Sequence, residues 1–542
     1  MPPITTPDHV AGWMQHNMCN IGDVKINEYM CLPATHDSGM DHHSWSTTHG
    51  TKNRTLNQTL GIGNQLRLGA RWFDLRPMLL DGDWYCGHFS SIPTFGWQGA
   101  TGVKLQEVID EVNEFLDKYP ELVILRVTHL HDARTGATIP QHHQQLLKKL
   151  FNGLKHIYWG KDKKSENNLD KKTLRDFIGN KVGKVIVTGE PEDGPGFSQG
   201  DFDSLPGSRT DFVAHGPSAN AEMSNAETFW NSKSLIDLAN KRQLDEYPYT
   251  PQRIYTELNE GSCGMFMIDN LHDGSLQTIC LAMSLARHMI KDPNRYGSIV
   301  VVYAGKLITD AGIKAKVMQA IKGRARYAVT NDSMGGDPWA WERKCAVACM
   351  VETKHQGRAP FLRARFAWEG EELDFTTDIE SINFGGKELY DHHFRTAYYN
   401  LFRMLREQLP ITPSIEFFGL TTPEDPQPGV VKDGLVYYRS IDGNVLKQRR
   451  LREHNTTSFC ADVQKLEWEG QIVRKAEAYE PFLWRLDYGG GTIQVTNELM
   501  GFDPAPGKRK RALLTYRSAR HGPMRFDPAN EFDNWTIKKA DP

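Results

Sequence analysis

The sequence lacks an excess of basic residues, long apolar runs and paired cysteines. Its 542 residues carry 64 Lys and Arg against 67 Asp and Glu, so no positive field favours binding to the phosphate backbone of a nucleic acid. No stretch of about 18 apolar residues occurs, as a transmembrane helix would require. The eight cysteines are dispersed, without two CxxC pairs at zinc-ligand spacing. Neither nucleic acid as a partner nor a cysteine-ligated metal is expected.

The N-terminal segment also lacks the basic and apolar regions of a secretory signal. We therefore expect a cytoplasmic protein that contacts membranes only peripherally and transiently. The hydrophobic fraction of 39% and the charged fraction of 24% are ordinary for a globular protein. A chain of this length exceeds what one hydrophobic core usually organises, which predicts more than one domain. Nothing in the pattern predicts the oligomeric state.

Residues 1–300 show an alternation of short apolar runs and helix-period segments. This alternation is typical of parallel strands joined by crossover helices, and we predict an α/β fold of the (β/α) TIM-barrel type. Active-site residues of such barrels follow the strands. The predicted strands are 29–34, 70–76, 83–89, 122–130, 184–189, 211–215, 263–269 and 298–304, and the predicted helices are 104–119, 140–154, 225–242 and 277–290.

Residues 301–542 form a second region, in which short β-branched and aromatic runs replace most helical patterns. The sequence TNxxMGxDP occurs twice within it, in segments 330–349 and 496–516. Gly and Asp-Pro in this pattern indicate a tight turn that leads into a strand. We predict a β-rich region with an internal repeat, most simply a β-sandwich, built either as two related modules or as one sandwich closed by both copies.

Four segments of the first region contain candidate catalytic residues. The predicted strand 29–34 runs into His36 and Asp37, and the strand after 81 ends at His88 beside a glycine, which allows close approach of a ligand. Alternation along 70–76 places Arg71 on one face, which we predict to be the barrel interior. Asp269 ends an apolar strand and requires a cationic or histidine partner there. Taken alone, Arg71 would be interpreted as half of a surface ion pair and Asp269 as a helix N-cap.

The order of these segments (THDSG, GARWFDLRP, GH after a short hairpin, ELVILRVTH) resembles the X-domain of phosphatidylinositol-specific phospholipases C. The resemblance covers about residues 25–300. It is closer to the bacterial-type, single-X-domain members than to the calcium-dependent eukaryotic enzymes. It implies a barrel with phosphodiesterase activity on a phospholipid.

The resemblance also implies roles for individual residues. His36 corresponds to the general base, His88 to the general acid, Asp269 to the aspartate that orients the base, and Asp37 to the neighbour that positions the second histidine or the arginine. Arg71 falls where calcium-dependent relatives place a metal-ligating carboxylate. A guanidinium there can neutralise phosphate charge, so we expect no metal and no cofactor. The histidine-rich loop 41–49 is interpreted as a surface loop.

Two positions depart from the bacterial pattern, in which cations follow the corresponding strands. His129 and Glu190 stand there, and both are candidate substrate-binding residues. Because Glu190 replaces a cation, the sequence does not identify the headgroup of the substrate. The candidates are inositol, a glycosylated inositol and another polyol. We predict a phosphoric diester hydrolase or lyase that acts through a cyclic phosphate. The alternatives are a phosphodiesterase of soluble glycerophosphodiesters and a lipid- or glycan-binding module that retains the barrel.

Overall fold

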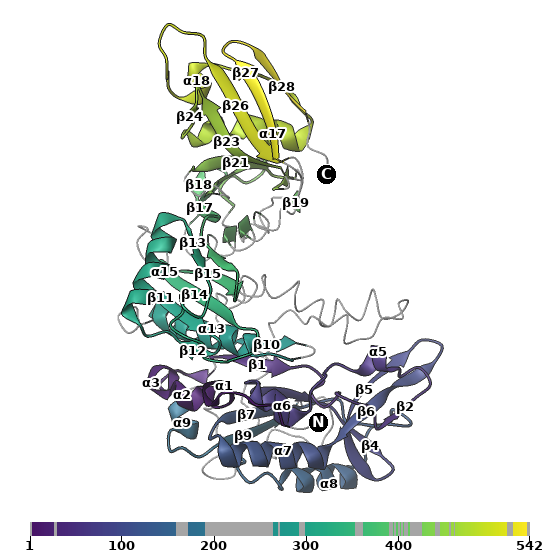
Figure 1. Ribbon diagram of the computed structural model, residues 1–542. Helices are drawn as coiled ribbons and strands as arrows, with labels where there is room; N and C mark the ends of the chain where they lie inside the picture. The colour runs from purple at the N-terminus through teal and green to yellow at the C-terminus, as the bar shows by residue number, and fades with distance from the viewer. Residues whose placement is uncertain are drawn as a thin grey trace. The chain divides into compact units, whose positions relative to one another are not determined.

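The computed structural model divides the chain into two compact units (Figure 1). The first comprises 1–314, 328–351 and 362–371, and the second comprises 315–327, 352–361 and 372–542. The structure describes residues 3–26, 30–158, 172–189, 264–268, 271–291, 299–352, 361–389, 425–439, 445–454, 457–459, 461–517 and 524–538, and eight further residues: 394, 397, 398, 401, 402, 405, 410 and 411.

A parallel five-stranded sheet forms the core of the first unit. Its strand order is β10-β1-β3-β7-β9, and all four pairings are parallel. The side chains of β1, β3 and β7 are almost all buried, as expected for parallel strands covered on both faces. The strands are β1 (Cys31–Thr35), β3 (Trp72–Leu75), β7 (Leu122–Val127), β9 (Lys184–Gly189) and β10 (Gly264–Ile268).

A second five-stranded sheet, of order β2-β6-β5-β4-β8, holds the hairpin that carries His88. Its strands are β2 (Trp45–Ser46), β4 (Pro77–Leu80), β5 (Asp83–Ile92), β6 (Gly96–Lys104) and β8 (His131–Asp132). The helices of this unit are α1 (Asp8–Ala11), α2 (Trp13–His16), α3 (Met18–Ile21), α5 (Lys52–Thr55), α6 (Ile62–Arg67), α7 (Leu105–Lys118), α8 (Gln141–Phe151), α9 (Leu174–Ile178) and α13 (Ser275–Lys291). Among the described residues, no helix is both long and apolar enough to cross a membrane.

The predicted barrel is present in part. The described strands form an open parallel sheet, and no closure into a barrel is seen among them; the predicted strand 211–215 and helix 225–242 lie outside the described residues. The predicted strand 298–304 does not join this sheet. It forms β11 (Ile299–Tyr303), which pairs antiparallel with β14 (Cys345–Glu352). The prediction of a strand at 298–304 is confirmed. An apolar run that is buried on both faces does not indicate which strand it pairs with.

The region after residue 298 repeats one arrangement three times. Each copy, here called a module, has a four-stranded antiparallel sheet in the order short-long-long-long and a separate two-stranded sheet. The four-stranded sheets are β12-β11-β14-β15, β18-β17-β20-β21 and β24-β23-β26-β27, and the two-stranded sheets are β13-β16, β19-β22 and β25-β28.

The first module contains β12 (Lys306–Leu307), α15 (Ala311–Gly323), β13 (Arg326–Ala328), β15 (Phe361–Trp368) and β16 (Glu372–Asp374). The second contains β17 (Asp378–Phe384), β18 (Lys387–Glu388), β19 (Pro410–Ile411), β20 (Asp433–Arg439), β21 (Lys447–Arg452) and β22 (Thr457–Ser458). The third contains β23 (Asp462–Trp468), β24 (Gln471–Ile472), η4 (Ala476–Ala478), α17 (Glu480–Tyr488), β25 (Gly491–Gln494), α18 (Asn497–Met500), β26 (Arg511–Arg517), β27 (Met524–Asn530) and β28 (Asn534–Ile537).

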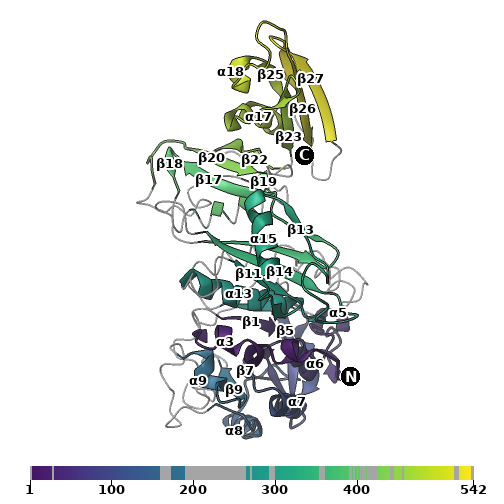
Figure 2. The same cartoon turned by 60° about the vertical axis from the view of Figure 1, so that its left-hand side comes forward.

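The predicted repeat coincides with the first and third modules. Asn331 accepts a hydrogen bond from the Tyr303 hydroxyl at 2.8 Å, and Asn497 accepts one from the Trp468 indole at 2.9 Å. In place of one β-sandwich, the described residues form three modules, each with a four-stranded and a two-stranded sheet, and helical segments lie between the strands of the first and third; Figure 2 shows the third, in yellow, with α17 beside its strands. The second module was missed because its turn lacks the TNxxMG letters.

Each module also buries one lysine between two carboxylates. The ammonium lies within 3.3 Å of an aspartate before it and a glutamate after it, and although burial opposes the charge, these carboxylates raise the pKa of all three lysines. The triplets are Lys344 with Asp337 and Glu369, Lys432 with Asp425 and Glu453, and Lys510 with Asp503 and Glu531. These triplets align the modules residue by residue.

Candidate active site

His36 and Asp37 lie in the turn that follows β1 at its carboxyl end. Asp37 adopts a left-handed backbone conformation with a φ of 42°, which Asp tolerates better than most residues. The next residue, Ser38, donates its backbone N–H to the carbonyl of Asp74 on β3 at 3.0 Å. Gly39 is required here, since a Cβ atom would lie 2.4 Å from the Cys86 sulfur. The turn is therefore held against both β3 and β5.

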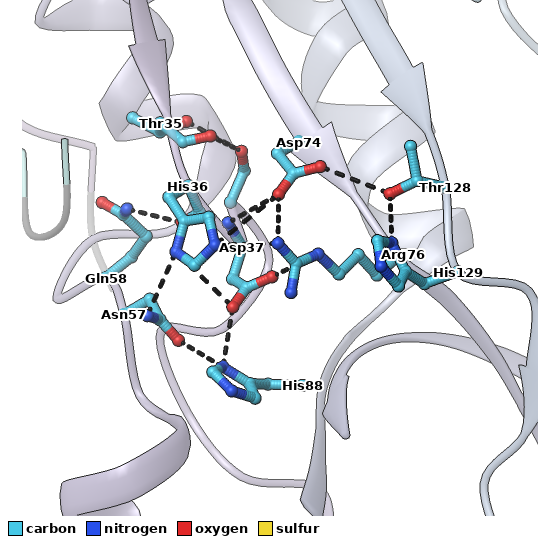
Figure 3. A network of polar contacts seen from close by, with 11 residues as sticks. Thr35, His36, Asp37, Asn57, Gln58, Asp74, Arg76, His88, Thr128 and His129 are labelled. Carbon is cyan, nitrogen blue, oxygen red and sulfur yellow. Dashed lines mark hydrogen bonds and ion pairs between the residues drawn. The ribbon is translucent and has the colours of Figure 1, made fainter. Parts of the chain in front are cut away.

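The carboxyl end of β3 supplies a carboxylate and a guanidinium. Arg76 directs Nε to Asp37 Oδ1 at 2.8 Å and Nη2 to Asp74 Oδ2 at 2.9 Å. The same Nη2 lies 2.8 Å from Nε2 of His36. Figure 3 shows the guanidinium between the two carboxylates and beside the imidazole.

His88 reaches the same cluster from β5. Its Nδ1 lies 2.7 Å from Asp37 Oδ2, and its ring centroid lies 6.4 Å from that of His36, nearly perpendicular to it. The side-chain amide of Asn57 lies between the rings, 3.3 Å from Nδ1 of His36 and 2.9 Å from Nδ1 of His88 (Figure 3). The histidine side chains are 14% and 27% exposed, so a ligand can reach both.

The two carboxylates are ionised and nearly inaccessible. Burial alone would raise the pKa of Asp37, but Arg76, His36 and His88 together hold it far below the usual range. The pKa of Asp74 is lowered in the same way, against burial, chiefly by Arg76 and His36. Two carboxylates and one guanidinium carry a net charge of −1, so one additional imidazolium neutralises the cluster.

The hydrogen bonds distinguish the two rings. A guanidinium only donates, so Nε2 of His36 accepts from Arg76 and is the unprotonated nitrogen. An ionised carboxylate only accepts, so Nδ1 of His88 carries a proton that it donates to Asp37. His36 thus presents an unprotonated nitrogen beside a guanidinium, and His88 a protonated nitrogen beside a carboxylate.

We expect the depressed pKa of Asp37 to appear in the stability of the protein. An aspartate in an unfolded chain titrates at about 3.9, so the stabilisation is complete above about pH 5 and is lost as the pH falls towards the folded-state value. Urea unfolding of wild type and Asp37→Asn, compared from about pH 7 to pH 3, measures it. The difference in unfolding free energy should stay constant down to about pH 5 and shrink below about pH 4. A difference that is flat over the whole range would contradict the assignment.

Three groups of this cluster offer possible metal-ligand atoms. His36, Asp37 and Asp74 each present one within 4.8 Å of the others. However, the Arg76 guanidinium already contacts both carboxylates. A metal ion would have to displace this cation, so the donor set fits an arginine-neutralised site better than a metal centre.

The structure brings together three of the predicted catalytic residues, His36, Asp37 and His88. Arg71 does not lie beside them, so the prediction that Arg71 lies on the face of the site is corrected. The guanidinium of Arg71 is completely buried and pairs with Glu121 at 2.8 Å. It also donates to the carbonyl oxygens of Leu66, Ala70 and Ala11. Arg71 precedes β3, at the amino end of the strand.

Three other predictions concern positions around the cluster. Asp269 and Glu190 lie outside the described residues. His129 follows β7 in a left-handed conformation with a φ of 55°. Its Nδ1 lies 2.9 Å from the Thr128 hydroxyl, which donates a long hydrogen bond to Asp74 at 3.5 Å. His129 is thus linked to the cluster through one intermediate residue.

The glycine beside His88 has a different role from the one predicted. A Cβ atom on Gly87 would lie 2.4 Å from Cγ of Met78 on the paired strand β4. The missing side chain therefore makes room for the packing of the hairpin, and the prediction that it makes room for a ligand is corrected.

The sequence analysis missed Asn57, Asp74 and Arg76. By strand alternation Asp74 and Arg76 lie on the face opposite to Arg71, and the sequence analysis expected the site on the face of Arg71. The position along the strand was the better signal, because Arg76 follows the carboxyl end of β3, where barrel active sites lie. Asn57 lies in the segment between α5 and α6 and carries no signal in a single sequence.

Comparison with known proteins yields a weak likeness to solved structures. No family model matches the sequence, and no curated protein matches it. A phosphatidylinositol-specific phospholipase C from Staphylococcus aureus is 14% identical, with a TM-score of 0.33, over 50% of this chain and 96% of that chain. The phosphatidylinositol-specific phospholipase C from Listeria monocytogenes is 16% identical, with a TM-score of 0.32, over 50% of this chain and 98% of that chain.

Proposed function

We propose that this chain is a phosphoric diester hydrolase of phospholipase C type, which cleaves a phosphodiester lipid whose headgroup carries a hydroxyl next to the phosphate. The observation that carries the proposal is the continuous network from His36 through Arg76 and Asp37 to His88. It combines a base, an anion-neutralising cation and an acid within one partly open cluster. The ordered sequence motifs around these residues support the same reaction class.

The first step uses the unprotonated nitrogen of His36. When the phosphate binds, the Nη2 donor of Arg76 moves from His36 Nε2 to a phosphoryl oxygen. Nε2 then takes the proton of the headgroup hydroxyl, whose oxygen attacks phosphorus. A charged donor at this position stabilises the negative charge that develops on the phosphoryl oxygens.

The leaving group is protonated by His88. Because Nδ1 of His88 is held by Asp37, its Nε2 is the nitrogen that delivers the proton to the alkoxide, which departs as a diacylglycerol-type alcohol. The products are a cyclic phosphate and the alcohol. Hydrolysis of the cyclic phosphate reverses the two roles: His88 accepts a proton from water and His36 returns one to the ring oxygen.

Product analysis after incubation with a mixed lipid extract tests this proposal. We expect diacylglycerol and a headgroup cyclic phosphate to appear first, followed by the ring-opened monophosphate, as followed by phosphorus NMR. The same products should form in the presence of a chelator, because Arg76 supplies the positive charge.

Other products would separate the alternatives. Turnover of soluble glycerophosphodiesters without turnover of lipids would replace the lipid substrate by a soluble one. Saturable binding of lipid vesicles without any product would favour a binding module. Loss of activity with the chelator, restored by a divalent cation, would contradict the role of Arg76.

A further inference from the structure

The last long strand of each module occupies the same place in its sheet. The three strands, β15, β21 and β27, align through the glutamates that follow them. In each module this glutamate donates its backbone N–H to the carbonyl of the buried lysine, at 2.8, 2.7 and 2.7 Å. The aligned segments are 363–365, 447–449 and 525–527.

These aligned segments differ in burial. Residues 363–365 are at most 5% exposed, and so are residues 447–449. In the third module, Arg525 is exposed, Asp527 is half-buried and Phe526 is 67% exposed. Phe526 stands where β21 has Gln448. The third module thus exposes a strand surface that is covered in the two preceding modules.

The second module shows what covers such a surface. The segment η4 and the helix α17 of the third module pack against β21. The amide of Gln448 donates to the carboxylate of Glu480 on α17. Burial, together with Glu477 and Glu480, raises the pKa of Tyr437 on the neighbouring strand β20. The covering element is therefore the helical segment of the following module.

The first module carries the corresponding helical segment, α15. It aligns with η4 and α17, because Ile308 and Val473 make the same backbone hydrogen bond at 2.9 Å just before it. Ala311 and Ala315 are exposed on α15, whereas Ala476, which aligns with Ala311, is only 7% exposed. The third module thus leaves its last long strand exposed, and the first module leaves the helix of the matching kind exposed.

The ion pair of the inner contact has apolar counterparts at both free ends. In the inner contact, Arg450 of β21 and Glu480 of α17 interact electrostatically. Pro528 stands where β21 has Arg450, Ala315 stands where α17 has Glu480, and both are exposed. With Phe526, the free strand therefore presents an apolar surface that matches the small residues of the free helix.

We propose that two copies of this chain associate head to tail, with β27 of one copy receiving α15 of the other. Phe526 is the apolar centre of the contact, and Pro528, on the same face of β27, meets Ala315 of the second copy. The association continues the packing of α17 on β21. Such a contact uses two different surfaces, so it either closes into a ring or extends into a filament.

Sedimentation velocity of the full chain over a concentration series tests this proposal. We expect wild type to associate as its concentration rises. Phe526→Asp should weaken the association by about tenfold or more, because a charge replaces the apolar centre of the contact. Phe95→Asp is the matched control, since Phe95 is 51% exposed on a hairpin of the first unit, and it should associate like wild type. A wild type that stays monomeric at every soluble concentration overturns the proposal.

An introduced charge pair gives the sharper result. Pro528→Arg and Ala315→Glu should each weaken self-association, because each places one unpaired charge in an apolar contact. A mixture of the two variants should form heterodimers, because the arginine introduced on β27 of one chain can meet the glutamate introduced on α15 of the other, as Arg450 meets Glu480. A mixture that behaves as the sum of its components contradicts the assigned contact. Circular dichroism of each variant verifies folding, and none of these residues belongs to the proposed catalytic cluster.

Discussion

Removal of either imidazole is expected to abolish most of the phosphodiesterase turnover. His36→Ala removes the base and His88→Ala removes the acid, and each such group contributes about 10²- to 10⁴-fold to a rate. The double variant should be little slower than the slower single variant. The effects on the rate of removing groups that act in one proton-transfer sequence are not additive. Initial rates on the lipid identified by product analysis measure these losses.

His156→Ala is a matched control for both variants. His156 pairs with Asp117 at 2.8 Å, so it is a histidine with a carboxylate partner outside the cluster, and its removal should leave the rate unchanged. A second readout is the leaving group: a substrate whose alcohol leaves without protonation should be rescued in His88→Ala but not in His36→Ala. Equal turnover by all variants would refute the acid and base roles.

The sequence predicts strands better than their partners. Apolar runs located β1, β3, β7, β9 and β10, because strands covered on both faces show continuous hydrophobicity. The same kind of run at 298–304 formed β11 in a different, antiparallel sheet. Pairing depends on contacts between distant segments, which a local pattern does not contain.

The candidate site shows the same difference: residues in short local motifs were predicted, and residues that depend on distant contacts were missed. His36, Asp37 and His88 were found because they sit in short motifs at strand ends. Arg76 was missed although it stands two residues from Asp74 and five from Arg71, because alternation defines two faces without saying which one is interior. The partner that decides the matter, Glu121, lies 50 residues away in the chain. The three modules likewise became evident only when strand order was known.

Substitutions of the two arginines near β3 are expected to differ in their effect on kcat. Arg76→Met removes the cation that contacts His36, Asp37 and Asp74, and we expect a fall in kcat of about 10²- to 10³-fold, the usual effect of losing a donor to a developing oxyanion. The stability of the protein should also fall, because Asp37 and Asp74, whose side chains are 0% and 2% exposed, lose their guanidinium partner, so kcat is measured per folded molecule. Arg76→Lys should restore only part of the rate, because an ammonium cannot make two parallel hydrogen bonds.

Arg71→Met should lower the urea concentration at which the protein unfolds without lowering the kcat of the folded molecules. It leaves the completely buried carboxylate of Glu121 without its cation, and breaking a buried ion pair on one side costs about 3–5 kcal/mol. Glu121 retains two backbone donors, from Met14 and Gln15, which places the expected loss at the lower end of that range. The folded fraction of Arg71→Met should turn over substrate at the wild-type rate. If Arg71→Met were stable but inactive while Arg76→Met were active, the phosphate-binding arginine would be Arg71 and the geometry proposed for catalysis would be wrong.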